Sequence, residues 1–301
     1  MGIVGESGSG KSVTSSSVMR LMPSKTAKIV EGDITFEGID LLKLSKKDLL
    51  KFRGNECCMI FQHPMTSLDP VVKIGHQMVE MIREHHKVSK KEAWNQAVEA
   101  LKMVGIPEAE KRMEAYPHEL SGGMCQPVII AMPVCGNPKL IIADEPTTAL
   151  DVTVQAQVLE LLKDLQKKMN TAILLITHNL GVVWEMCDTV MVMYAGNTVE
   201  YADTKTLYQE PLHPYTWGLL DSMPKLSSSS KEALVTIPGT PPDLRLTGYC
   251  CNFYNRCPYV TDACRESAPP LVEVKPGHFV ACHRQNGVNQ LKRRGATGDG
   301  K

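Results

Sequence analysis

The first residues of the chain form a loop whose residue types bind phosphate groups. The segment fits the pattern G-x-x-x-x-G-K-S, between the apolar pair Ile3–Val4 and a helix predicted over Ser12–Leu21. Its members are Gly5, Glu6, Ser7, Gly8, Ser9, Gly10, Lys11 and Ser12. Glycines let backbone N–H groups curl around phosphate oxygens, Lys11 reaches the β- and γ-phosphates, and the Ser12 hydroxyl ligates Mg²⁺. The strand-loop-helix context favours a nucleoside triphosphate site over a flexible Gly/Ser loop.

Two adjacent carboxylates follow a second apolar run. Leu140–Ala143 is predicted to be a buried strand, and Asp144 and Glu145 stand at its carboxyl end. In phosphoryl transfer the aspartate of such a pair supports Mg²⁺, and the next glutamate polarises the attacking water. A carboxylate pair that only begins a loop is the alternative, and the phosphate-binding loop upstream argues against it.

Four further motifs complete an ordered series along the chain. Gln62 follows the apolar run Met59–Phe61, Leu120–Met124 reads L-S-G-G-M, Ala149–Asp151 reads A-L-D, and His178 follows an apolar run and Thr177. In this order they resemble the glutamine loop, signature loop, D-loop and switch histidine of ATP-binding cassettes. The resemblance implies an α/β fold, namely the P-loop NTPase fold of an ABC-type nucleotide-binding domain. Such a domain has a mostly parallel sheet plus a helical subdomain.

The same resemblance implies a role for each of these residues. Catalytic roles fall to Glu145, His178 and Gln62. Mg²⁺ is expected to bind through Ser12, Gln62 and Asp144. The signature residues Ser121, Gly122 and Gly123 are expected to close on ATP held by an opposite subunit, and Asp151 belongs to the D-loop.

Three longer segments resemble one branch of the cassettes more closely. Phe61–Pro70, Ala143–Gln157 and His213–Thr216 are similar to segments of the oligopeptide/dipeptide transporter ATPases. The resemblance implies ATP hydrolysis that energises uptake of oligopeptides or dipeptides, or in some relatives nickel, through a separate permease. It also implies a second ATPase subunit, identical or related, an external substrate-binding protein, and a peripheral place on the cytoplasmic face of the inner membrane.

Helix and strand patterns alternate as far as about Tyr201. Besides the strand before Asp144, short apolar runs predict strands at Cys57–Phe61 and Ala172–Thr177. Apolar residues at helical spacing predict helices at Ser89–Val104 and Val152–Met169.

The composition changes after these elements, which predicts a second region. We expect an ATP-binding domain over 1–210, with a helical subdomain at about 73–136. A transporter-type C-terminal region is expected over 211–301, with a small cysteine-rich module at 249–284.

Four cysteines in this module are predicted to bind a metal centre. Cys251, Cys257, Cys264 and Cys282 offer four thiolates, enough for tetrahedral zinc or an iron–sulfur cluster. Their spacing is not that of a C-x₂-C zinc ribbon, and it resembles the C-terminal module of the oligopeptide transporter ATPases, some of which carry a 4Fe–4S cluster. We therefore expect a 4Fe–4S cluster, with zinc or no metal as the alternatives.

Two features depart from the cassette pattern. Only Met1–Val4 precede the loop, so the strands and the adenine-stacking aromatic residue of relatives are missing, and we expect a truncated chain that binds ATP less tightly. Pro127 and Pro133 stand in the helix after the signature loop, where an interior proline costs about 3 kcal/mol. We expect that helix to kink or start late, which would impair the ATPase activity.

Composition and charge argue against other classes of protein. The 33 basic and 33 acidic residues cancel, which disfavours a nucleic-acid partner. No apolar stretch is long enough to cross a membrane, and no secretory leader is expected. A DNA-repair cassette would need a long coiled coil between Gln62 and Ser121, where no heptads occur, and a ribosomal one carries two cassettes. A non-catalytic ATP-binding regulator remains an alternative because of the truncation and the prolines.

Overall fold

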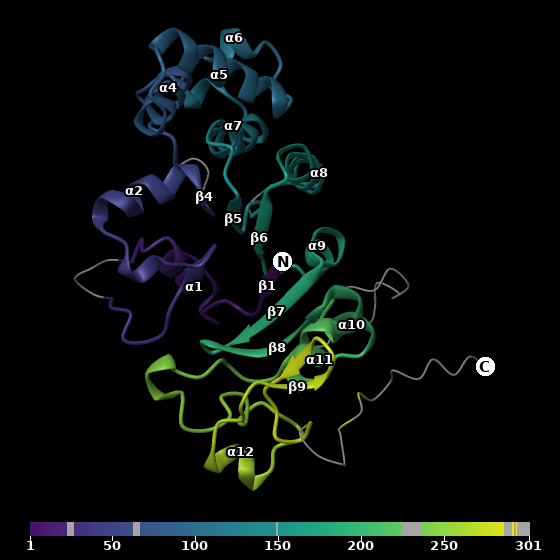
Figure 1. Ribbon diagram of the computed structural model, residues 1–301. Helices are drawn as coiled ribbons and strands as arrows, with labels where there is room; N and C mark the ends of the chain where they lie inside the picture. The colour runs from purple at the N-terminus through teal and green to yellow at the C-terminus, as the bar shows by residue number, and fades with distance from the viewer. Residues whose placement is uncertain are drawn as a thin grey trace. The chain divides into compact units, whose positions relative to one another are not determined.

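The computed structural model describes residues 1–22, 27–62, 67–148, 150–223, 236–285, 291 and 293. The chain forms two compact units, drawn together in Figure 1. We call Met1–Lys11 together with Leu175–Lys301 the discontinuous unit, and Ser12–Leu174 the continuous unit. Among the described residues, no helix combines the length and the apolar character that crossing a membrane requires.

The discontinuous unit is built on a mixed sheet. Its strands are β1 (Gly2–Val4), β7 (Thr189–Tyr194), β8 (Asn197–Asp203), β9 (Val272–Lys275), β10 (His278–Val280) and the end of β6 (Ala172–Ile176). β1 is parallel to both β6 and β7, whereas β8 is antiparallel to β7. β10 pairs antiparallel with both β8 and β9, so the C-terminal part of the chain extends the sheet that carries β1.

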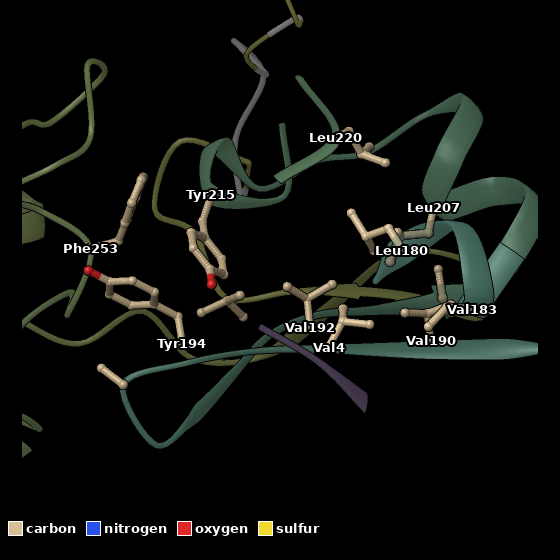
Figure 2. Packing of buried hydrophobic residues seen from close by; sticks show 13 residues of the cluster. Val4, Leu180, Val183, Val190, Val192, Tyr194, Leu207, Tyr215, Leu220 and Phe253 are labelled. Carbon is tan, nitrogen blue, oxygen red and sulfur yellow. The ribbon is translucent and has the colours of Figure 1, made fainter. Parts of the chain in front are cut away.

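The described residues of this unit also form four α-helices and a core of large side chains. The helices are α9 (Leu180–Met186), α10 (Thr204–Gln209), α11 (Pro214–Asp221) and α12 (Asp262–Glu266), and Leu244–Leu246 forms a 3₁₀ turn. Figure 2 shows the core, in which the rings of Tyr194, Tyr215 and Phe253 meet. Their centroids lie 4.6 to 5.5 Å apart, within the range of favourable ring contacts. Cys251 and Cys257 pack against the same cluster.

The continuous unit contains the remaining strands and most of the helices. Its strands are β2 (Thr35–Phe36), β3 (Ile39–Asp40), β4 (Cys57–Ile60), β5 (Leu140–Asp144) and the start of β6. Its helices are α1 (Lys11–Val18), α2 (Lys46–Asn55), α4 (Ile74–His85), α5 (Lys90–Met103), α6 (Ala109–Arg112), α7 (Gly122–Cys135) and α8 (Val152–Met169), with 3₁₀ turns at Leu41–Lys43 and Pro117–Glu119. β4 and β5 are parallel, and α5 packs against α4 and α7.

Local sequence signals predicted several of these elements well. The predicted strands correspond to β4, β5 and β6, and the predicted helices to α5 and α8. Ser89 caps α5 by accepting the Glu92 N–H, as its residue type favours. α1 ends at Val18, short of the predicted Leu21, because Arg20 adopts a left-handed backbone conformation (φ 50°) that no α-helix contains.

The prediction of a late start for the helix after the signature loop is wrong. α7 begins at Gly122, directly after the N-cap Ser121, and includes both Pro127 and Pro133. Many of its apolar side chains are buried, among them Cys125, Val128, Ile129, Ile130 and Ala131. Because burying an aliphatic side chain contributes roughly 1.5–3 kcal/mol, this packing offsets the backbone hydrogen bonds that the prolines remove.

Candidate nucleotide-binding site

The phosphate-binding loop follows β1 in the discontinuous unit and depends on its glycines. Gly5, Gly8 and Gly10 have φ values of 155°, 80° and 101°. A Cβ atom on Gly5 would lie 2.2 Å from the Met193 carbonyl oxygen, so only glycine fits where the loop leaves the strand. The turn between β7 and β8 also contacts the loop, because the Gly196 N–H donates to the Ser9 carbonyl oxygen at 2.9 Å.

The polar side chains of the loop point to an anionic ligand. Lys11 is only 6% exposed, and its Nζ donates to the carbonyl oxygens of Gly5 (2.8 Å) and Glu6 (3.0 Å). The Ser9 hydroxyl is buried and has no hydrogen-bond partner among the described residues. A buried lysine and an unsatisfied hydroxyl inside a glycine loop fit phosphate oxygens, which accept hydrogen bonds from both.

Glu6, inside the loop, is fixed by residues from far along the chain. Its carboxylate accepts two hydrogen bonds from Arg256, at 2.6 and 3.0 Å, and its backbone N–H donates to the Tyr215 hydroxyl at 2.8 Å. Sequence patterns alone did not predict these contacts. The only signals were Tyr215 in a family-like motif and the position of Arg256 before Cys257, and neither indicates a contact with the loop.

His178 lies at the same edge of the sheet as the phosphate-binding loop. β1 and β6 are parallel, with Ile3 opposite Ile176, so both chains leave the sheet at their carboxyl ends. The Thr177 N–H donates to the Ile3 carbonyl oxygen at 3.2 Å, which extends this pairing by one residue. His178 is exposed, and Asn179 after it caps α9. The discontinuous unit therefore contains the loop through Lys11 and the predicted switch histidine.

Gln62, Asp144 and Glu145 meet in the continuous unit. β4 and β5 are parallel with Ile60 opposite Ala143, so the residues after both strands emerge side by side. The Gln62 amide Nε2 donates to Glu145 Oε2 at 2.9 Å, and Thr148 Oγ1 donates to the same oxygen at 2.7 Å. Asp144 is buried at the end of β5.

The backbone at Glu145 is strained. Its φ of 47° lies in the left-handed region, which costs a residue with a side chain on the order of 1–3 kcal/mol. Such strain concentrates at functional sites, and it turns the Glu145 carboxylate out of the strand direction toward Gln62 and Thr148.

The signature and D-loop residues also belong to the continuous unit. Ser121 is exposed, and its side chain makes no capping hydrogen bond to α7. Gln126 in α7 is buried, and its amide donates to the Pro146 carbonyl oxygen at 2.7 Å, which joins this helix to the segment after Glu145. Asp151 caps α8 by accepting the Val154 N–H, and Ala149 lies outside the described residues.

The four cysteines of the predicted metal site line one small enclosed cavity in the discontinuous unit. Burial, and then the neighbouring thiols, raise the pKa of Cys251, Cys257 and Cys282 to about 11. Cys250 lines a different cavity. Within the part of the chain that the structure describes, no group of three His, Cys, Asp or Glu side chains is arranged to hold a metal ion.

Two protein-family models match different segments of the chain. Residues 1–148 match the model of the ABC transporter family. Residues 199–264 match the model of the oligopeptide/dipeptide transporter C-terminal region. Among solved structures, the chain resembles a dimeric post-hydrolysis state of the ATP-binding cassette MJ0796 bound to ADP and Pi, with a TM-score of 0.59 and 27% identity over 67% of this chain and 84% of that one. The fold is therefore that of an ABC ATPase.

Relatives over nearly the full length narrow the class further. The chain is 54% identical over 280 residues to the oligopeptide transport ATP-binding protein OppD of Bacillus subtilis, covering 93% of this chain and 78% of the relative. It is 49% identical to OppD of Escherichia coli (94% and 83% covered) and 49% identical to the dipeptide transport ATP-binding protein DppD of Lactococcus lactis (93% and 80%). The chain belongs to the family of oligopeptide/dipeptide ABC transporter ATP-binding proteins.

Proposed function

We propose that this chain hydrolyses ATP to energise the uptake of oligopeptides or dipeptides through a separate permease. The observation that carries the proposal is a complete phosphate-binding loop in a chain about half identical to peptide transport ATP-binding proteins. The Gln62–Glu145 hydrogen bond adds the acid–base part of an ATPase site. The proposed ATP-binding domain covers 1–210, and the proposed transporter-type C-terminal region covers 211–301.

The proposed chemistry divides among residues whose local geometry suits each task. The loop from Gly5 to Ser12 binds the triphosphate, and Lys11 supplies the cation nearest the β- and γ-phosphates. Ser12, Gln62 and Asp144 are the proposed Mg²⁺ ligands, and the ion supplies charge neutralisation between the phosphate oxygens. Because Gln62 donates its amide N–H to Glu145, its carbonyl oxygen is left for a hard cation.

Glu145 and His178 are the proposed catalytic groups. Glu145 accepts hydrogen bonds from the Gln62 amide and the Thr148 hydroxyl, which orient its carboxylate. A carboxylate held in this way can polarise the attacking water and accept its proton. His178 is exposed at the edge where the phosphate-binding loop emerges, and its proposed partner is the γ-phosphate.

The proposed partners are a second ATPase subunit and transmembrane permease subunits. The cassette MJ0796 is dimeric in its solved structure. Ser121 is exposed and makes no side-chain capping bond to α7, which supports the proposal that its hydroxyl and the amides at the start of α7 bind ATP of a partner subunit. The proposed assembly lies on the cytoplasmic face of the membrane, with an external substrate-binding protein that delivers the peptide.

Reconstitution with the cognate permease in proteoliposomes tests this proposal. We expect vanadate-sensitive ATPase activity that an oligopeptide or dipeptide stimulates in the presence of the substrate-binding protein. Glu145→Gln in the same complex should abolish the stimulation. Stimulation by Ni²⁺ and not by peptides would reassign the substrate, and ATPase activity that no substrate changes would contradict coupled uptake.

We further propose that the four cysteines lining one cavity bind a 4Fe–4S cluster. Four thiolates are the usual ligands of such a cluster. The support for the proposal is that all four cysteines line one enclosed cavity.

Anaerobic purification of the full chain tests the cysteine site. We expect brown protein with close to four irons per chain, and Cys257→Ser should lose them. Cys250→Ser is the matched control and should keep the iron, since Cys250 lines a different cavity. Colourless protein with one zinc, or with no metal, would contradict the cluster.

A further inference from the structure

We propose that Arg256, in the cysteine-rich module, is a positioning residue for the phosphate-binding loop, and that it acts by neutralising and fixing Glu6. The inference deepens the proposed ATPase function and rests on it. It assigns to the C-terminal region an indirect part in nucleotide binding, through Glu6.

Glu6 is fixed through its carbonyl oxygen, its N–H and its carboxylate. Its carbonyl oxygen accepts from Lys11 Nζ at 3.0 Å and from the Ser9 N–H at 3.2 Å. Its N–H donates to the Tyr215 hydroxyl, and both of its carboxylate oxygens accept from Arg256. Any movement of Glu6 therefore changes the path of the loop and the position of the lysine that holds phosphate.

Every nitrogen of the Arg256 guanidinium donates a hydrogen bond. Its side chain is only 4% exposed, and Nε donates to the Pro238 carbonyl oxygen at 2.8 Å. Nη2 donates to the Ile237 carbonyl oxygen at 3.2 Å, and Nη1 donates to the Tyr194 hydroxyl at 3.3 Å. The guanidinium carbon also lies 5.8 Å from the centre of the Tyr194 ring, within cation–π distance.

The remaining support comes from the cysteine-rich module and the aromatic core. The Arg256 N–H donates to the Phe253 carbonyl oxygen, and Cys257 follows directly in the chain. Tyr194, Tyr215 and Phe253 form the ring cluster in Figure 2, so the two tyrosines that contact Arg256 and Glu6 share one core. The module and the loop are therefore joined through rigid, buried contacts.

The negative charge of Glu6 explains why an arginine is needed beside it. A carboxylate inside a phosphate-binding loop repels the negative charge of the nucleotide. A bidentate guanidinium cancels that charge and fixes its direction at the same time. Removing Arg256 would leave the Glu6 carboxylate unpaired beside the phosphates, and it would free the loop to adopt conformations that ATP binding must then restrict.

Nucleotide titrations of the full-length wild type and its variants test this inference. We measure MgADP affinity by isothermal titration for wild type, Arg256→Met, Glu6→Gln and the double variant. Arg256→Met should weaken MgADP binding about tenfold, which corresponds to about 1.4 kcal/mol. Adding Glu6→Gln should restore most of that loss, because it removes the unpaired charge. Arg256→Lys should fall between wild type and Arg256→Met, since lysine keeps the charge but not the bidentate geometry.

The control is a second arginine–carboxylate pair in the same unit. Arg245 makes a bidentate contact with Asp243, but its side chain is 88% exposed, so Arg245→Met should leave the MgADP affinity unchanged. Urea unfolding of each variant shows whether the chain is folded under the titration conditions. Unchanged affinity in Arg256→Met, or a loss that Glu6→Gln does not repair, overturns the inference. A wild-type chain that binds no MgADP refutes the proposed function and this inference with it.

Discussion

Two glutamates, one in each compact unit, accept hydrogen bonds from donors of different kinds. Glu6 accepts from the two ends of one buried guanidinium, whereas Glu145 accepts from the neutral Gln62 amide and Thr148 hydroxyl. A cationic partner cancels a carboxylate's charge, and neutral donors orient it while it remains able to take a proton. The bidentate guanidinium fixes a carboxylate that shapes the binding loop, and the Gln62 and Thr148 contacts orient the carboxylate that we propose acts on water.

The largest expected effect comes from changing Glu145, the carboxylate that we propose acts on water. Glu145→Gln keeps an acceptor for Gln62 and Thr148 but cannot take a proton, so ATP hydrolysis should fall by about 10²–10⁴-fold. The affinity for MgATP should stay near that of wild type. Glu6→Gln is the matched change in the other unit, and it should alter the rate by less than about tenfold. Equal losses of rate in the two variants would contradict the division of roles.

The second-largest effect concerns His213. This residue contacts the backbone of Tyr215, whose hydroxyl in turn accepts the Glu6 N–H. His213 caps α11, and its Nδ1 accepts the Tyr215 N–H at 3.0 Å. Burial lowers the pKa of His213 to about 4 in spite of the nearby Glu200 carboxylate. In the unfolded chain the pKa is near 6.5, so the folded state resists protonation that the unfolded state accepts.

His213 should therefore contribute about 3 kcal/mol to the free energy of unfolding. This contribution should be fully present above about pH 6.5 and should be lost as the pH decreases toward 4. His213→Asn retains a capping acceptor without the titration and should flatten this dependence. The measurement is the urea midpoint as a function of pH. His118→Asn, at an exposed histidine of the continuous unit, should leave the slope as in wild type. An unchanged slope in His213→Asn would exclude this histidine as the cause.

The smallest effect concerns α7. Because the helix starts at Gly122 in spite of its prolines, the placement of Ser121 does not depend on removing them. Pro133→Ala should restore one backbone hydrogen bond and raise the free energy of unfolding by about 1 kcal/mol, with no change in ATPase rate. Pro107→Ala, outside any helix, serves as the control in urea unfolding. A faster ATPase in Pro133→Ala would show that the proline does disturb the signature loop.

How much the sequence predicted depended on how local each signal was. α8 has its N-cap Asp151, an apolar face at helical spacing and a left-handed Asn170 at its end, all within one segment, and its bounds were predicted correctly. The phosphate-binding loop is also local, since its glycines and lysine lie within eight residues.

The parts that sequence reasoning missed depend on tertiary packing. Glu6 and Arg256 are 250 positions apart, and no spacing rule relates them. The late start predicted for α7 was wrong because proline propensity is a local quantity, while the packing that overrides it at the helix start comes from elements such as α4, α5 and α8.

The most direct test of the account is isothermal titration of the purified full chain with MgATP, alongside Lys11→Ala. We predict saturable binding by wild type at one nucleotide per chain and a loss of about 100-fold in Lys11→Ala, because that variant leaves the phosphates without their buried cation. A wild-type chain that does not bind MgATP, or a Lys11→Ala chain that binds it as tightly as wild type, would contradict the account.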